Sequence, residues 1–417
     1  MASVLESVKV PPIGISRKYP ELGTGPVPTE IYHDAAIYEK EIEAIFKRCW
    51  FMIGRVEQVA KPGEFFVYEM PTFKYSVIIC RDKKGTVNAF HNVCRHRGNV
   101  VEHRKSGKCN VFTCRFHGWS YHLDGKIAGI RDEEGFFDID RSTLNLKPIQ
   151  MQIWNGFIFV SPEENPSQTV EEYLGEQGAD LNGYPFELGT QSYKFEGEVD
   201  CNWKLAIDSF CEVYHIPVLH ARSVSPTMFV PDNPNGRLLD TIIKGDHLTN
   251  SHWSTFNPTK NPVQKLAYEN LSGASVVSTF VTEMDMPKGL NETRADNWCV
   301  DLAVFMPGFA IVLTTGMYVV HQAWPLGPNR CLYQQTGYLR KAENAAQRFG
   351  QENSMIEFRD VVFEDMSTLE RIQRALDTGQ MPYFHYHDHE VALRHRHKVV
   401  LDKLEEYDRL KAAGAIS

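Results

Sequence analysis

The sequence lacks an excess of basic residues and a long uninterrupted apolar run. Its 417 residues carry 44 Lys and Arg against 53 Asp and Glu, a formal charge of −9. Surfaces that bind nucleic acid need clustered positive charge, so nucleic acid is not an expected partner. The most apolar stretch, Leu302–Val320, is interrupted by Pro307, Gly308 and Gly316. This favours two buried strands joined by a turn over a span that would place the chain in a membrane.

Targeting and nucleotide-binding signals are also missing. Residues 1–12 show no basic start followed by an apolar stretch, so we expect a cytoplasmic protein. No Gly-x-Gly-x-x-Gly turn is present, since Gly23–Thr24–Gly25 runs directly into Pro26, and no ferredoxin-type run of cysteines occurs. We therefore expect the chain to be unable to take hydride from NAD(P)H itself and to need a separate reductase.

The nine cysteines are an odd number, spread thinly over a long chain without secretory features. This pattern favours free thiols and metal ligands over disulfides. Seven of them have no metal-like neighbours and are expected to be ordinary buried residues: Cys49, Cys80, Cys109, Cys201, Cys211, Cys299 and Cys331.

The texture of the sequence changes twice along the chain. Residues 1–50 combine an extended arm with a helix that Asp34 caps. Residues 51–162 consist of short β-rich segments separated by turns, which predicts a small antiparallel β domain. Residues 163–417 are mixed, with a helix around Trp203–His215, strands between Thr279 and Thr336, and helices near 342–376 and 388–411. The predicted class is α+β.

Two loops of the β-rich block each offer one thiol and one imidazole in the same order, as Cys94-x-His96 and Cys114-x-x-His117. A Rieske [2Fe–2S] cluster needs this set, because two Cys hold one iron and two His hold the other. The alternatives are a structural Cys2His2 zinc site and a chance occurrence of these four residues in unrelated loops. Zinc motifs usually space paired ligands by two or more residues, so Cys94-x-His96 favours the cluster.

A second group of ligands follows in the mixed region. Glu212 and His215 stand three apart, so a helix would place them on one face. His215 and His220 stand five apart, and Pro217 between them would disturb the helix and let the two rings converge. Two His with one carboxylate form the facial triad of non-haem Fe(II) enzymes that activate dioxygen.

The carboxylate of such a triad has to come from elsewhere in the chain. Asp365, in a helical stretch near the C-terminus, is the candidate. From the residues alone Asp360 and Glu364 compete with it, and acidic residues on helices are usually solvated. A His pair alone is also more often structural than ligating.

Together these residues resemble the Rieske oxygenase family, the α-subunits of aromatic-ring-hydroxylating dioxygenases. The likeness covers most of the chain, including the helix before Trp50, the opening Asn202–Trp203–Lys204 and Glu364–Asp365. It implies a small antiparallel β Rieske domain inserted in a larger α+β catalytic domain with a central antiparallel sheet and flanking helices. The domains would then be 1–50 with 163–417 (catalytic) and 51–162 (Rieske).

The resemblance also implies the cofactors and roles of particular residues. Cys94, His96, Cys114 and His117 would hold the [2Fe–2S] cluster, and His215, His220 and Asp365 the mononuclear Fe(II). Asn202 would lie near that iron. In this family electrons pass from the cluster of one subunit to the iron of the next, which implies a homotrimer, while a separate β subunit stays open. Glu212 stands where many members have Asp as the carboxylate bridge between subunits. Glu here is similar to the subgroup of quaternary-ammonium monooxygenases.

The expected function is that of a terminal oxygenase. It would use O2, and electrons from NAD(P)H relayed by a flavin/iron-sulfur reductase with or without a ferredoxin. It would hydroxylate or dihydroxylate an aromatic or other apolar organic substrate, as in aromatic hydrocarbon catabolism. The alternative is a monooxygenase or N- or O-demethylase acting on a quaternary ammonium or methoxy substrate. Alternatives of other classes are an electron-transfer Rieske protein without catalysis and a zinc-stabilised interaction protein.

Five histidines near the C-terminus form a further cluster: His385, His387, His389, His395 and His397. A metal site there is the less favoured interpretation, because alternating His before and along a charged helix more often marks a solvated surface.

Overall fold

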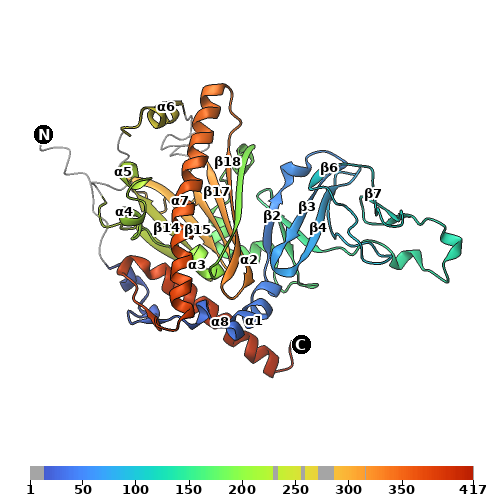
Figure 1. Ribbon diagram of the computed structural model, residues 1–417, viewed down its shortest axis with the longest axis horizontal. Helices are drawn as coiled ribbons and strands as arrows, with labels where there is room; N and C mark the ends of the chain where they lie inside the picture. Colours follow the sequence, from blue (N-terminus) through green and yellow to red (C-terminus); the bar gives the residue numbers. More distant parts are fainter. Residues whose placement is uncertain (1–13, 229–232, 255–258, 271–285, 315, 417) are drawn as a thin grey trace, which may run out of the picture. The chain divides into compact units, whose positions relative to one another are not determined.

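The computed structural model describes residues 14–228, 233–254, 259–270, 286–314 and 316–416. The chain divides into two compact units (Figure 1): one is Lys47–Tyr173, and the other combines the residues up to Phe46 with Leu174–Ser417. None of the helices in the described ranges is long and apolar enough to cross a bilayer. The first residues of the predicted N-terminal arm lie outside the described residues. The same holds for Thr279, where the predicted strands of the catalytic region were expected to begin.

The unit Lys47–Tyr173 is built of small antiparallel sheets with the strand orders β10-β11-β2, β5-β4-β3-β6 and β7-β8-β9. Its strands are β2 (Phe51–Arg55), β3 (Glu64–Met70), β4 (Tyr75–Arg81), β5 (Val87–His91), β6 (Ser106–Lys108), β7 (Val111–Thr113), β8 (Ser120–His122), β9 (Ile127–Gly129), β10 (Gln150–Trp154) and β11 (Phe157–Ser161).

Strand β4 is central in this unit because it pairs with β3 on one side and β5 on the other. Its apolar run from Val77 to Cys80 is fully buried, as a central strand requires. Ile78 packs in one cluster with Phe112, Trp119 and Tyr121, which also contains Cys94 and Cys114. The core of the β unit therefore lies directly beneath the two predicted cluster loops.

The other unit is built around a seven-stranded antiparallel sheet with the order β12-β18-β17-β16-β15-β14-β13. Its strands are β12 (Gln191–Val199), β13 (Asp240–Lys244), β14 (His247–Trp253), β15 (Trp298–Phe305), β16 (Phe309–Leu313), β17 (Tyr318–Gly327) and β18 (Arg330–Leu339), and β1 (Val27–Pro28) pairs separately with β19 (Tyr383–Phe384). β15 and β16 join through Met306–Pro307–Gly308, which confirms the predicted strand pair, and the apolar stretch continues into the start of β17.

Helices flank this sheet, and the long helix α7 lies against it (Figure 1). They are α1 (Ala35–Ala44), α2 (Val170–Asp180, kinked at Gly175), α3 (Trp203–Asp208), α4 (Ile216–Leu219), α5 (Ser225–Met228), α6 (Pro262–Asn270), α7 (Ala345–Asp377) and α8 (Val391–Ala412). Met355 of α7 packs against Val319 and Leu339. A Cβ at Gly337 would come within 2.2 Å of the Met355 sulfur, so glycine permits this close approach.

The predicted caps and helix limits agree in part with the structure. Asp34 does cap α1, accepting from the N–H groups of Ala36 at 2.7 Å and Ile37 at 2.9 Å. The predicted helix from Trp203 to His215 is wrong, because α3 ends at Asp208. Pro217 does not interrupt a helix: it lies in the first turn of the new short helix α4, where its missing N–H costs nothing.

The histidine cluster near the C-terminus is mostly buried, which corrects the expectation of a solvated surface. His385 and His387 are exposed, but His389, His395 and His397 are buried. His389 Nδ1 accepts from Leu238 N–H at 3.0 Å, and His397 Nε2 lies 3.1 Å from the Pro28 carbonyl oxygen. The three buried rings therefore help to pack α8 and the turn before it.

Among the seven cysteines expected to be buried, Cys109 is only partly so.

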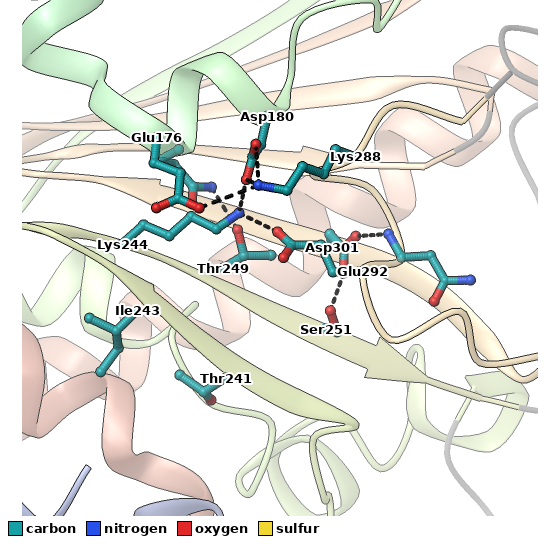
Figure 2. Close-up of polar contacts among 12 residues, drawn as sticks. Glu176, Asp180, Thr241, Ile243, Lys244, Thr249, Ser251, Lys288, Glu292 and Asp301 are labelled. Atoms are coloured by element: carbon teal, nitrogen blue, oxygen red, sulfur yellow. Dashed lines mark hydrogen bonds and ion pairs between the residues drawn. The ribbon is translucent and has the colours of Figure 1, made fainter. Parts of the chain in front are cut away.

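A polar cluster at the β13 edge of the seven-stranded sheet connects this strand to α2 (Figure 2). The buried Lys244 ammonium donates to Asp180 at 2.6 Å and also to Glu292. The more exposed Lys288 reaches the same Asp180 carboxylate. Buried charges persist only when paired in this way, so the cluster fixes α2 against the sheet.

Candidate metal centres and active site

The two predicted cluster loops have the same backbone geometry. Cys94 N–H donates to the Asn99 carbonyl, and Cys114 N–H to the Trp119 carbonyl, both at 2.8 Å. In each loop the glycine four residues on donates back to the cysteine carbonyl at 3.0 Å, with φ 76° at Gly98 and 80° at Gly118. Glycine adopts this left-handed conformation without strain. The two loops thus share hydrogen bonds and backbone angles, in agreement with a matched pair of ligand loops.

The four predicted ligand side chains converge beneath these turns. The His96 and His117 rings lie 4.5 Å apart between centroids, and His96 stacks on Trp119 at 4.9 Å. His96 Nδ1 is buried and has no hydrogen-bond partner among the described residues. A buried imidazole nitrogen without a partner is costly unless it binds something, and a metal ion fits that need.

Polar neighbours around the two thiols support a thiolate at one of them. Burial acts to raise the pKa of Cys114, but hydrogen bonds from the Phe116 N–H and the Asn99 amide outweigh it and lower the pKa. The Tyr121 hydroxyl lies 3.3 Å from the Cys94 sulfur. The thiolate is the form of cysteine that binds metal, and hydrogen-bond donors around the sulfur stabilise it. Asn99 and Tyr121 were not singled out from the sequence.

In the catalytic unit, His215, His220 and Asp365 come together as a group that could hold a metal ion. One ligand atom from each lies within 4.8 Å of the others. Asp365 Oδ1 is buried, 3.1 Å from His220 Nε2 and 3.4 Å from His215 Nε2, and makes no well-formed hydrogen bond with any residue that the structure describes. Three lone-pair atoms that converge without satisfying one another fit a cation between them. Of the acidic candidates in α7, only Asp365 takes this place.

A carboxylate holds the other ring nitrogen of each of these histidines. Glu212 Oε1 contacts His215 Nδ1, and Glu364 Oε2 lies 2.6 Å from His220 Nδ1. Because a carboxylate only accepts, each Nδ1 carries the proton and each Nε2 keeps a lone pair for the metal. Glu212 reaches His215 although no helix joins them, through a turn in which Glu212 also accepts from the His215 N–H at 3.2 Å.

The charges of this site favour a cation. Burial acts to lower the pKa of His215, but the nearby carboxylates of Asp365 and Glu212 outweigh it and raise the pKa to about 10. The same pair of neighbouring charges would favour a metal ion in place of the proton.

Three aromatic residues near Asp365 were not assigned by sequence reasoning as a group. Phe210 lies 4.4 Å from the His321 ring and stacks parallel to Tyr333 at 5.9 Å, and His321 Nδ1 is 2.5 Å from the Tyr333 hydroxyl. Burial lowers the pKa of His321 to about 3, so this imidazole is neutral. The alternation of apolar and polar residues along a strand could not identify His321 and Tyr333, because β17 and β18 are buried on both faces.

Asn202 has a structural place in the fold. Its Oδ1 caps α3 by accepting from Lys204 N–H at 3.0 Å, and its amide donates to the Pro328 carbonyl at 2.6 Å. One end of the side chain thus caps α3, and the other ties this cap to the turn between β17 and β18. A role for Asn202 near the iron stays a prediction.

Comparisons with known proteins agree with this geometry. Residues 186–406 match the ring hydroxylating alpha subunit (catalytic domain) family, and residues 49–141 match the Rieske [2Fe-2S] domain. Choline monooxygenase, chloroplastic, of Spinacia oleracea is 24% identical over 367 residues, covering 84% of this chain and 72% of that protein. The 2-halobenzoate 1,2-dioxygenase large subunit of Burkholderia cepacia is 34% identical over 287 residues, covering 64% and 58%. The structure of a quaternary ammonium Rieske monooxygenase superposes with TM-score 0.72 at 20% identity, covering 94% of this chain and 98% of the other.

The fold and the two sites define a Rieske-type non-haem iron oxygenase. The chain belongs to the family of ring-hydroxylating alpha subunits: it is a terminal oxygenase with a Rieske [2Fe–2S] domain and a catalytic domain for mononuclear iron. As is general in the family, O2 is the co-substrate and the electrons come from a reductase. Family membership sets aside the zinc-stabilised interaction protein and the electron carrier without catalysis.

Two narrower expectations do not follow from these comparisons. Aromatic hydrocarbon catabolism is not supported, because the relatives include monooxygenases named for choline, glycine betaine and carnitine. The cytoplasmic location stays a prediction, since the relatives include choline monooxygenases named as chloroplastic.

Proposed function

We propose that Cys94, His96, Cys114 and His117 hold the cluster and that His215, His220 and Asp365 hold the mononuclear iron. Bound there, the two groups supply one-electron transfer and activation of O2. The protein's own contribution is to fix the ligand atoms: Glu212 orients the His215 imidazole, and Asp365 is kept buried and ionised between the two histidines.

We further propose that the reaction is monooxygenation of a small quaternary ammonium compound, including oxidative removal of an N-methyl group. The observation that carries this proposal is the aromatic group Phe210, His321 and Tyr333 beside Asp365. Aromatic faces attract quaternary ammonium groups, and nearby carboxylates add to that attraction. The relatives that act on such compounds, and Glu in place of Asp at 212, support the same class.

A second candidate is oxygenation of an aromatic acid. It is favoured by the identity of 34% with the 2-halobenzoate 1,2-dioxygenase large subunit. The two candidates differ in the charge of the substrate, so a single panel separates them.

The test is a substrate panel with purified, iron-loaded protein, a generic NADH-dependent reductase and ¹⁸O2. Choline, glycine betaine and carnitine stand on one side, and benzoate and 2-chlorobenzoate on the other. We expect an oxidised product, or an N-demethylated product together with formaldehyde, from a quaternary ammonium compound and no product from the benzoates. Product is measured by mass spectrometry, because reduction of oxygen without substrate turnover also consumes NADH. Labelled diol from a benzoate, with no quaternary ammonium product, would replace the proposal by the second candidate. Turnover with NADH and no reductase would refute the need for a partner.

The metal assignments are tested by iron counting. Wild-type protein should hold three irons per chain, two in the cluster and one mononuclear. His215→Ala should lose one iron and keep the reduced-cluster magnetic resonance signal, whereas Cys94→Ser should lose that signal. Three irons in His215→Ala would contradict the assigned ligands.

We also propose a homotrimer in which Glu212 connects the iron site of one subunit with the cluster ligand His117 of the next. Each unit exposes apolar side chains next to its own site: Phe116 is 55% exposed beside the cluster loop, and Val218 is 82% exposed in α4. Single exposed apolar residues are common, but these two flank the sites that an assembly would join.

Mixed assemblies test this arrangement. Cys94→Ser and His215→Ala are each expected to be inactive alone, while co-expressed chains should regain activity, because a good cluster and a good iron then meet across an interface. Light scattering should give three times the mass of one chain. Failure of the mixture to regain activity, with both variants assembled, would contradict transfer between subunits.

A further inference from the structure

Helix α7 presents two adjacent carboxylates to the same histidine. Asp365 is buried, 4% exposed, with Oδ1 3.1 Å from His220 Nε2. Glu364 is 35% exposed, with Oε2 2.6 Å from His220 Nδ1. Successive residues of a helix point about 100° apart, so one can face the interior while the longer neighbour reaches around the ring. His220 itself is 1% exposed. Its imidazole is therefore held at both nitrogens by one helix.

Glu364 cannot be an alternative ligand in this arrangement. Its carboxylate approaches Nδ1, while Asp365 and His215 converge on the side of Nε2. A side chain at one edge of an imidazole does not reach the metal at the other. The competition left open between Glu364 and Asp365 is thus resolved by position: one faces the metal side and the other faces the proton side of His220.

The carboxylates that fix the tautomers of His215 and His220 come from different parts of the chain. His215 is held by Glu212, three residues earlier in its own turn. His220 is held by a helix 144 residues further along the chain. The orientation of His220 therefore depends on how α7 docks, whereas that of His215 is set locally. Glu364 Oε2 also accepts from the Ser223 hydroxyl at 2.7 Å, which ties the carboxylate in place.

We propose that Glu364 is a positioning residue for the mononuclear iron, accepting the Nδ1–H of His220 so that Nε2 keeps its lone pair and its direction toward the metal. This inference rests on the ligand set proposed above. A carboxylate behind a ligand histidine fixes its tautomer and raises its basicity, and removing such a partner typically costs about 10- to 100-fold in metal affinity or activity.

A merely structural role would have a different signature. Glu364 could serve only to fasten the segment after His220 to α7 through Ser223. In that case Ser223→Ala would reproduce the loss, and thermal stability would fall together with iron binding. In the proposed role, Ser223→Ala keeps the contact with His220 and has little effect on iron.

The experiment measures iron retention in full-length protein against a chelator, with the cluster signal as an internal standard. Glu364→Ala should release the mononuclear iron at about 10- to 100-fold lower chelator concentration than wild type. Glu364→Gln should lie between them, because the amide oxygen still accepts the Nδ1–H but carries no charge. The matched control is Asp360→Asn. Asp360 lies one turn earlier on the same helix face and is exposed, and its ion pair is with Arg359. It should retain iron as wild type does.

The outcomes are distinguishable. Wild-type iron retention in both Glu364 variants would overturn the inference, provided that His215→Ala releases the iron. Full retention in His215→Ala would instead mean that the proposed ligand set is wrong. If Glu364→Ala lost the cluster signal or melted early, Glu364→Gln, which preserves size, would decide: reduced iron retention at unchanged melting temperature supports positioning, and unchanged retention overturns it.

Discussion

A buried ion pair beneath the iron-site segment offers the sharpest test of the energetics. Lys204 in α3 is 2% exposed and Glu41 in α1 is fully buried, with Nζ 2.6 Å from Oε1. The second oxygen of Glu41 accepts from the Trp203 indole N–H at 2.9 Å. Burial raises the pKa of Glu41 and lowers that of Lys204, in both cases against their mutual attraction. The cost of removing these charges from water therefore exceeds what the pairing returns.

Removing only one partner should be much worse than removing both charges. Lys204→Met leaves the Glu41 carboxylate buried with a single donor, which typically costs about 3–5 kcal/mol. The unit that contains α1 and α3 has roughly 290 residues. With an unfolding entropy of about 2.1 cal/mol/K per residue, that loss lowers the melting temperature by about 5–8 °C. The double variant Glu41→Gln/Lys204→Met removes both charges and keeps an acceptor for Trp203, so most of the loss should be recovered.

The assay is thermal unfolding followed by circular dichroism on wild type, both single variants and the double variant. A double-mutant cycle then gives the coupling between the two sites. The exposed pair of Arg359 and Asp360 is the control, since Asp360→Asn should change stability by less than about 1 kcal/mol. A loss below 1 kcal/mol in Lys204→Met, or a double variant as unstable as the sum of the singles, would refute the reasoning.

Two further predictions concern the polar cluster of Figure 2. Lys244→Met should cost about 2–4 kcal/mol in thermal unfolding, because Asp180 keeps only exposed Lys288 as a partner, while Lys288→Met should cost less than about 1 kcal/mol; equal losses would argue against burial as the cause. Burial raises the pKa of Asp301 to about 6 despite donors from Ser251, Asn291 and Trp298. Since the folded pKa lies above the unfolded value, this group stabilises the fold fully below about pH 4 and loses about 3 kcal/mol as pH rises through 6. Urea unfolding at pH 4.5 and 7 should show this slope in wild type relative to Asp301→Asn, and identical slopes would contradict it.

The parts that could be predicted from the sequence are those whose partners are close along the chain. The order Cys-x-His and Cys-x-x-His requires only two tight turns, and the glycines that end them carry the positive φ that such turns need. The strand pair around Pro307 and the cap at Asp34 are local in the same way. Composition alone made nucleic acid an unexpected partner, and this stays a prediction.

The tertiary structure decided what depends on which faces of distant elements pack together. The sequence could name three acids near the end of the chain, but only the docking of α7 separates Asp365 from Glu364. The continuous helix predicted to His215 is absent because α3 ends at Asp208, where the Cys211 N–H turns back to the Asp208 carbonyl at 2.8 Å. His395 and His397 looked solvated, yet the first part of α8 is buried. Local spacing determines which atoms could bind a metal, whereas long-range packing determines which of them meet.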